Sequence, residues 1–226
     1  MNLIQRWWQQ APATVAFCAA MILAYVATAI QSLSLVDNLS RSGIADASIL
    51  YLPDMYDAWG PMRALTSAFM HIGPGHLALN LVLLFLLGRE IEQYAGRGLY
   101  ILVWLTAAIG ASTLTVWLDP INATAGASGV GYALMALLVG VVMQRGGDLR
   151  APIVLIIVNI AFTVITPGIS LWGHLGGLLA GFLLSVALLP RSRGWRACCI
   201  SMVLIGYLVA LFWRLATFTT SGLWSL

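Results

Sequence analysis

The sequence predicts an all-α protein that crosses a membrane several times and forms a single membrane-embedded domain. Of its 226 residues, 61% are hydrophobic and 8% are charged, which is outside the usual range of soluble globular domains. The charged residues separate several uncharged stretches of the roughly 20 residues that a bilayer core requires. All basic side chains are arginines and they are scattered, so they bear on membrane topology and give no indication of nucleic-acid binding.

The first predicted span is 13–32, because no charged residue lies between Arg6 and Asp37. A signal peptide is the alternative for this segment, since Ala27-Thr28-Ala29 resembles a cleavage site, but the apolar run is long and its start is weakly basic. The segment 34–75 mixes charged and apolar residues, which is typical of an ordered, partly helical loop at the membrane interface. The remaining predicted spans are 76–94, 99–118, 128–143, 151–166, 172–189 and 197–213.

Polar or glycine-containing turns define the ends of these later spans. Pro167-Gly168 divides an uncharged run that is too long for one helix. Glu90 and Glu92, close to Arg89 and Arg97, are predicted to form a solvated, ion-paired helix end without a chemical role. The other predicted turns are 95–98, 119–122, 144–150 and 191–196.

The distribution of arginines predicts the orientation, because cytoplasmic loops carry an excess of basic residues. Seven spans then give a cytoplasmic N-terminus and an extracytoplasmic C-terminus, in the inner membrane of a bacterium. The arginines expected on the cytoplasmic side are Arg6, Arg89, Arg97, Arg145, Arg150, Arg191, Arg193 and Arg196, and those expected outside are Arg41, Arg63 and Arg214.

Three polar residues begin the second, fourth and sixth spans, which all run inward from the outer face: His76, Ser128 and His174. Intramembrane polar residues at a common depth indicate a functional site. Ser128 and His174 form a candidate nucleophile and general base, and Tyr132 lies one helical turn below Ser128, where the imidazole could pack on its ring. The alternative is that Ser128 is a small packing residue and His174 an interfacial histidine.

Further residues are predicted to support this dyad. His76 and Asn80 share one helical face and, with the backbone N–H of Ser128, could form an oxyanion hole, although an intramembrane Asn often only binds a neighbouring helix. Small residues would let the sixth span pack closely on the fourth and bring His174 to Ser128; they are Gly129 on the fourth span and Gly173, Gly177 and Gly181 on the sixth.

Other membrane-protease chemistries are disfavoured. The sequence has no His-Glu-x-x-His motif, and Gly147-Asp148 lies in a polar turn, so no metal site and no aspartyl dyad is predicted. No cofactor is expected.

From about 62 to 189 the chain resembles the rhomboid family of intramembrane serine proteases. Gly126-x-Ser128-Gly129 is similar to the family's nucleophile motif, and His174-x-x-Gly177-x-x-x-Gly181 to its base and packing stripe. His71-x-x-x-x-His76-x-x-x-Asn80 resembles its second-span motif, whose last two members are implied oxyanion donors. Met62 stands where the family has the tryptophan of a Trp-Arg pair, and Gly173 stands where alanine is common.

The resemblance implies a six-helix core followed by a seventh span, and a serine endopeptidase that cleaves single-span membrane proteins at the outer membrane face, in contact with membrane lipid. One alternative is a catalytically silent relative that binds membrane proteins without cutting them, against which the presence of both Ser128 and His174 argues. Another is a transporter, which should have polar groups near mid-membrane on paired broken helices.

Overall fold

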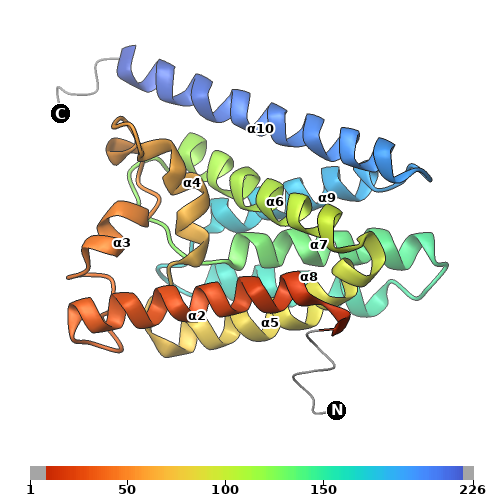
Figure 1. Ribbon diagram of the computed structural model, residues 1–226, viewed down its shortest axis with the longest axis horizontal. Coiled ribbons are helices and arrows are strands. Elements are labelled where there is room, and N and C mark those ends of the chain that lie inside the picture. Colours follow the sequence, from red (N-terminus) through yellow and green to blue (C-terminus); the bar gives the residue numbers. More distant parts are fainter. Residues whose placement is uncertain (1–8, 221–226) are drawn as a thin grey trace.

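The chain folds into a bundle of long helices with a compact, partly helical segment at one end (Figure 1). The computed structural model describes residues 9–220, so Arg6, which contributed to the predicted orientation, lies outside the described residues. The long helices are α2 (Pro12–Ser32), α5 (Gly73–Ala95), α6 (Arg97–Leu118), α7 (Ser128–Gln144), α8 (Arg150–Ile165), α9 (Leu171–Ala187) and α10 (Arg193–Thr220). The short ones are α3 (Gly43–Ser48), η1 (Leu52–Asp54), η2 (Gly60–Met62), α4 (Arg63–Thr66) and η3 (Ser67–Phe69).

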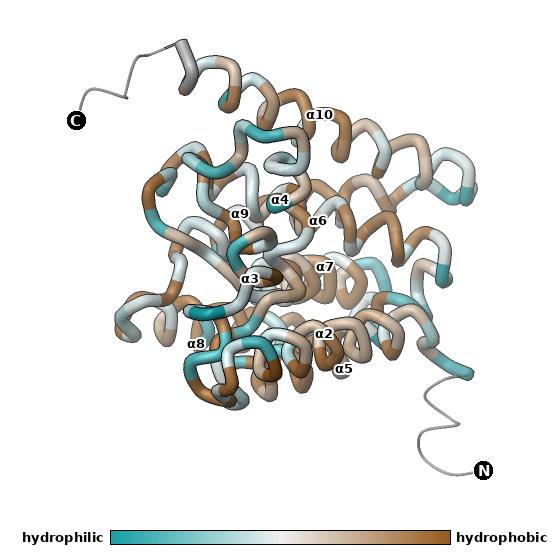
Figure 2. The backbone as a smooth tube through the Cα atoms, turned by 60° about the vertical axis from the view of Figure 1, so that its left-hand side comes forward, coloured by the Kyte–Doolittle hydropathy of each residue, from teal (hydrophilic) through white to brown (hydrophobic). Residues whose placement is uncertain are grey.

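The predicted all-helical membrane architecture is confirmed. By length and composition, α2, α5, α6 and α10 can each cross a membrane, whereas α7, α8 and α9 are apolar but shorter. Figure 2 shows hydrophobic helices with the hydrophilic residues gathered mainly in the connections. Large apolar side chains face outward on α2, α8 and α10, as expected of helices in contact with lipid; they include Leu23, Ile30, Ile157, Val164, Val209 and Trp213.

Several helix boundaries differ from the predicted spans, and the largest differences are at the start of α5 and at both ends of α10, which continues to Thr220 beyond the predicted 213. Helix α5 begins at Gly73, earlier than the predicted 76, because Pro74 has a fixed φ that suits the first turn of a helix. Helix α10 begins at Arg193, inside the predicted basic loop, where the Ser192 hydroxyl accepts a hydrogen bond from the Trp195 N–H. The basic residues at this position therefore form the first turn of a long helix.

The centre of the bundle is α7, which Figure 1 shows surrounded by the other helices. Its side chains are buried around most of its circumference, including Tyr132, Leu134 and Met135. Helix α9 packs on α7 through Gly177 and Gly181, where an added Cβ would collide with the carbonyl oxygens of Gly129 and Ala133. The close approach of these two backbones therefore requires glycine at both positions.

Glu92 was predicted to lie at a solvated, ion-paired helix end, and for this residue the prediction is wrong. Its side chain is 2% exposed, and its two oxygens accept hydrogen bonds from the N–H groups of Ala13 and Thr14 and from the Thr14 hydroxyl, at 2.8–3.0 Å. These are orphan donors of the first turn of α2, which carries no acidic residue of its own there. Glu92 thus caps α2 from another helix, whereas Glu90 is exposed as predicted.

The segment between α2 and α5 is anchored by Arg63, which is 8% exposed. Its guanidinium donates hydrogen bonds to the carbonyl oxygens of Asp46 and Ile49 and lies 3.8 Å from the Asp54 carboxylate. An arginine with several donors in a fixed geometry can hold backbone carbonyls that have no other partner. The arginine therefore fixes the fold of this segment even though Met62 precedes it.

Candidate active site

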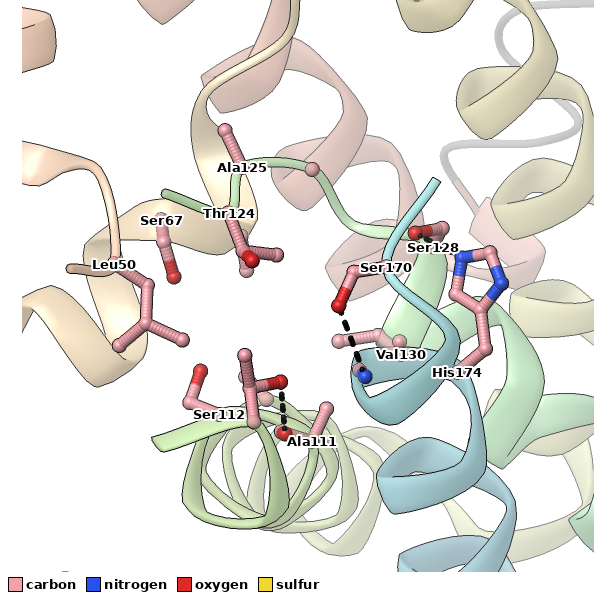
Figure 3. Close-up of a pocket in the computed structure, with 16 residues that line it drawn as sticks. Leu50, Ser67, Ala111, Ser112, Thr124, Ala125, Ser128, Val130, Ser170 and His174 are labelled. Atoms are coloured by element: carbon pink, nitrogen blue, oxygen red, sulfur yellow. Dashed lines mark hydrogen bonds between the residues drawn. The ribbon is translucent and has the colours of Figure 1, made fainter. Parts of the chain in front are cut away.

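The nucleophile candidate lies at the first residue of α7 and the base candidate in the first turn of α9. Ser128 Oγ is 2.8 Å from Nε2 of His174, which is within hydrogen-bond distance. His174 is 7% exposed, and Ser128 is half-buried. Figure 3 shows both side chains at one end of a pocket, joined by this bond. The two predicted site residues therefore meet across α7 and α9.

Tyr132 lies under the histidine, on the turn of α7 that follows Ser128. Its ring stacks on the His174 imidazole, with ring centroids 4.1 Å apart and an angle of 19° between the planes. Its hydroxyl lies 2.6 Å from Oγ1 of Thr163. The stacking limits rotation of the imidazole, and the hydroxyl ties α7 to α8.

Thr163 also contacts the histidine directly, although it was not among the site residues predicted from the sequence. Its Oγ1 is 2.7 Å from Nδ1 of His174, on the opposite side of the ring from Ser128. Thr163 is 4% exposed, and only it and Pro152 are buried on α8. One signal was available in the sequence: Asn159 and Thr163 are polar, four residues apart and on one face of an otherwise apolar helix.

The loop that leads into Ser128 is held by backbone contacts from the segment before α5. Gly126 donates its N–H to the Ser67 carbonyl at 2.9 Å, and Thr124 exchanges two backbone hydrogen bonds with Leu50. Gly126 has φ +124°, which an L-residue rarely adopts, and an added Cβ there would meet the His76 ring. These contacts place Ser128 at the start of its helix rather than in a free loop.

His71 adds a side-chain contact to this loop. The ring is fully buried, with Nδ1 3.1 Å from the Phe69 carbonyl and Nε2 3.3 Å from the Ala127 backbone nitrogen. Because the Ala127 N–H donates to Nε2, the ring hydrogen belongs on Nδ1, where it can be donated to Phe69. Burial, and to a lesser extent the neighbouring His76, lowers the pKa of His71 to about 4. Sequence reasoning named His71 only as the first member of a motif.

His76 and Asn80 lie on α5, but the structure gives them different surroundings. The His76 ring lies against Gly126, two residues before Ser128, and its centroid is 5.2 Å from that of His71. Asn80 is 4% exposed, and its amide donates one hydrogen to the His76 carbonyl at 2.9 Å. This contact lies within α5 and does not join it to a neighbouring helix. The amide carries a second hydrogen.

A pocket opens beside Ser128 and His174, lined by the loop before α7 and by α6, α7 and α9. Its space for water-sized molecules is about 30 Å³, enough for roughly one or two waters. Figure 3 shows the hydroxyl-bearing residues that surround it. They are Ser67, Ser112, Thr115, Thr124, Ser128 and Ser170. The pocket therefore places several hydroxyl groups next to Ser128, within a lining that is mostly apolar.

Within residues 9–220, no group of three or more His, Cys, Asp or Glu side chains is arranged to hold a metal ion. The site described above consists of a serine, histidines, a tyrosine, a threonine and an asparagine. Such an arrangement can activate a hydroxyl and stabilise developing charge with hydrogen bonds.

Comparison with known proteins identifies the family to which the chain belongs. The chain is 36% identical over 149 residues to rhomboid protease GluP of Bacillus subtilis, covering 63% of this chain and 29% of that protein. It is 25% identical over 163 residues to RHOMBOID-like protein 1 of Arabidopsis thaliana, which covers 69% of this chain and 40% of that protein. It is 30% identical over 200 residues to rhomboid-related protein 3 of Homo sapiens, which covers 76% of this chain and 48% of that protein. Each match thus spans less than half of the relative's own length. The rhomboid domain model matches residues 58–191, more than half of the chain, and the chain therefore belongs to the rhomboid family.

Proposed function

We propose that this protein is an intramembrane serine endopeptidase that cleaves transmembrane proteins with a Ser128–His174 dyad. The observation that carries this proposal is the 2.8 Å contact between Ser128 Oγ and His174 Nε2 at the end of a pocket that several hydroxyl groups line. Membership of a family in which a relative is named a protease adds support. A silent relative would have no need for a nucleophile and a base at bonding distance.

In the proposed reaction, His174 Nε2 takes the proton of Ser128 while Oγ attacks the carbonyl carbon of the scissile peptide bond. The carbonyl oxygen becomes an oxyanion. When the tetrahedral intermediate collapses, the protonated imidazole gives its proton to the leaving amine. A water from the pocket beside Ser128 then hydrolyses the acyl-enzyme by the same proton transfers in reverse order.

The proposed oxyanion donors are His76, the second amide hydrogen of Asn80, and the backbone N–H of Ser128. The last belongs to the first turn of α7, where N–H groups have no partner within the helix. The His76 ring lies against the glycine two residues before the nucleophile, which supports a place near the reacting carbonyl. Such preorganised donors stabilise the charge that develops in the transition state.

The proposed substrates are single-span membrane proteins, cut near the outer end of their membrane helix. Helix α7 has 17 residues, about 25 Å, which is shorter than the roughly 30 Å of a bilayer core and supports a recessed Ser128. A helical substrate backbone is shielded and hydrogen-bonded, so it must unwind before attack. We expect Gly or Pro near the cut, and a small residue before it because Gly129 and its neighbours are tightly packed.

The proposed location is a bacterial inner membrane, with the N-terminus in the cytoplasm and the C-terminus outside. The distribution of arginines supports this orientation. In Figure 1, α10 ends on the same side as α3 and α4, while α2 begins on the opposite side, which supports an odd number of spans. A reporter fused after the last residue should be extracytoplasmic, and a cytoplasmic reporter signal would contradict the orientation.

The experiment that tests the function is labelling of the purified protein with a serine-directed fluorophosphonate, followed by identification of the modified residue. We expect labelling at Ser128 that disappears in Ser128→Ala and in His174→Ala. A matched assay uses a single-span substrate and a version in which its Gly and Pro residues are replaced by Leu. Equal cleavage of the two would contradict the unwinding requirement, and absence of both labelling and cleavage would favour a silent relative.

A further inference from the structure

The hydroxyl of Thr163 is the partner of the His174 ring nitrogen that faces away from Ser128. Serine proteases of other folds usually place a carboxylate at this position, which holds the imidazole in the correct tautomer. Here the 2.7 Å contact joins Nδ1 to a neutral hydroxyl on α8. Either His174 Nδ1 or Thr163 Oγ1 can donate the hydrogen of this contact. The direction decides whether His174 can act as a base, because only an unprotonated Nε2 can accept the proton of Ser128.

The direction of each bond follows from counting hydrogens. Ser128, Tyr132, Thr163 and a neutral His174 each carry one polar side-chain hydrogen. Four short contacts connect them: Ser128 to His174 at 2.8 Å, Tyr132 to Thr163 at 2.6 Å, Thr163 to His174 at 2.7 Å, and Thr163 to the Asn159 carbonyl at 2.9 Å. The number of hydrogens therefore equals the number of contacts.

One assignment supplies every contact with a hydrogen. A carbonyl oxygen cannot donate, so the Thr163 hydrogen goes to Asn159. The two lone pairs of Thr163 Oγ1 then accept from the Tyr132 hydroxyl and from Nδ1–H of His174. Nε2 has no hydrogen and accepts from Ser128. If Thr163 instead donated to Nδ1, the Asn159 contact would lose its hydrogen and Nε2–H would point at Ser128, leaving the serine hydrogen unused in this network.

We propose that Thr163 is a positioning residue, whose hydroxyl keeps the hydrogen of His174 on Nδ1 and thereby presents an unprotonated Nε2 to Ser128. The inference rests on the proposed function of the dyad. During attack, the Ser128 proton moves to Nε2 while Nδ1–H continues to donate to Thr163, so the threonine itself never changes protonation. The Asn159 bond and the Tyr132 hydroxyl orient the threonine, and Tyr132 also stacks on the ring.

The kinetic test uses Thr163→Val, which keeps the shape of the side chain and removes the hydroxyl, and Thr163→Ser, which restores it. We expect Thr163→Val to lower kcat by about 10- to 100-fold with little change in KM, because a buried N–H loses its acceptor and the tautomer is no longer fixed. Thr163→Ser should recover most of the rate. The matched control is Thr106→Val on α6, since Thr106 is also buried and, among residues 9–220, the one hydrogen-bond partner of its hydroxyl is the carbonyl four residues earlier.

The tautomer is read directly by ¹⁵N NMR of histidine-labelled protein, which contains three histidines. The signals of His174 are identified by their loss in His174→Ala. We expect a protonated Nδ1 and an unprotonated Nε2 in the wild type, and a mixture or reversal in Thr163→Val. Since this measurement needs no substrate, it stands even if the protein proves to be catalytically silent.

Three results would overturn the inference. The first is a wild-type His174 with its hydrogen on Nε2. The second is a Thr163→Val variant that keeps the kcat of Thr106→Val. The third is a Thr163→Ser variant as slow as Thr163→Val, which would show that the methyl group and its packing matter instead of the hydroxyl. A wild type that neither labels nor cleaves would refute the proposed function, and the NMR result would then decide on the tautomer alone.

Discussion

The hydroxyl of Ser128 lies 2.8 Å from Nε2 of His174, although 46 residues separate them in the chain. The contact exists because α7 and α9 approach at Gly177 and Gly181, where no side chain stands between their backbones. It also depends on the loop before Ser128, which Ser67 and His71 hold in place. Each of these dependencies can be tested separately.

Ser128→Ala and His174→Ala are each expected to lower cleavage by at least about 10³-fold, because each removes one half of a single proton-transfer unit. The double variant should be little slower than either single one, since members of one catalytic unit are strongly non-additive. Rates are measured on a single-span substrate in detergent or liposomes. Substantial cleavage by either single variant would rule out the dyad.

His76→Ala and Asn80→Ala are expected to lower kcat by up to about 10²- to 10³-fold while KM changes little, since oxyanion donors act mainly in the transition state. Thermal stability is measured beside the rate, because Asn80 also bonds within α5. Leu79→Ala is the matched control, as Leu79 is exposed on the same helix. A loss of rate that follows only a loss of stability would assign these residues a structural role.

Gly177→Ala should weaken both folding and activity. The added Cβ would collide with the Gly129 carbonyl, so α9 must move away from α7, and overpacking of this kind typically costs about 1–3 kcal/mol of unfolding free energy. Gly206→Ala is the control, because a Cβ at Gly206 on α10 has no atom within 4 Å. Thermal unfolding of both variants gives the comparison. Equal stability of the two would contradict the close α7–α9 contact.

The sequence was sufficient for those features that depend on composition along the chain. Uncharged runs bounded by charges and glycines predicted the helical membrane architecture. Ser128 and His174 were predicted as site residues because each is a polar residue near the start of such a run. The proximity of the two residues followed once the helices were given directions, because alternate spans begin at the same face.

The contacts that sequence reasoning missed are made between elements that only tertiary packing brings together. Glu92 has Arg89 and Arg97 as charged sequence neighbours, so a solvated helix end was predicted, but its hydrogen-bond partner Thr14 is 78 residues away. Thr163 reaches His174 from α8, and a threonine in an apolar run is usually only a packing residue. Neither partner can be read from spacing along the chain.

Glu92→Gln should destabilise the protein, because the amide offers one acceptor oxygen in place of two and points its own N–H groups at donors of α2. We expect a loss of about 1–3 kcal/mol in unfolding free energy, the usual cost of leaving buried donors unsatisfied. Glu90→Gln is the matched control, since Glu90 is exposed on the same helix. If both substitutions lower the unfolding midpoint equally, Glu92 does not act as a buried cap.

Stability should fall as the pH is lowered from about 6.5 toward 4, in part because of His71. Its pKa in the folded protein is about 4, below the ordinary histidine value of about 6.5, so in this range the unfolded chain binds a proton that the folded protein does not. The contribution of neutral His71 is therefore fully present above pH 6.5 and is lost as the pH falls. The physical cause of the lowered pKa is burial of the ring, to which the neighbouring His76 adds. A protonated Nε2 could also no longer accept the Ala127 N–H.

The measurement compares the wild type with His71→Gln by thermal unfolding between pH 7 and pH 5. At pH 7 the variant should be less stable, because it lacks the ring that links Phe69 to Ala127. As the pH falls, only the wild type loses the contribution of His71, so the two unfolding midpoints should converge. Taking the difference between the two unfolding midpoints at each pH cancels the contribution of the other titrating groups, because both proteins contain them. Parallel curves over this range would show that His71 does not titrate there and that its contact with Ala127 does not depend on a neutral ring.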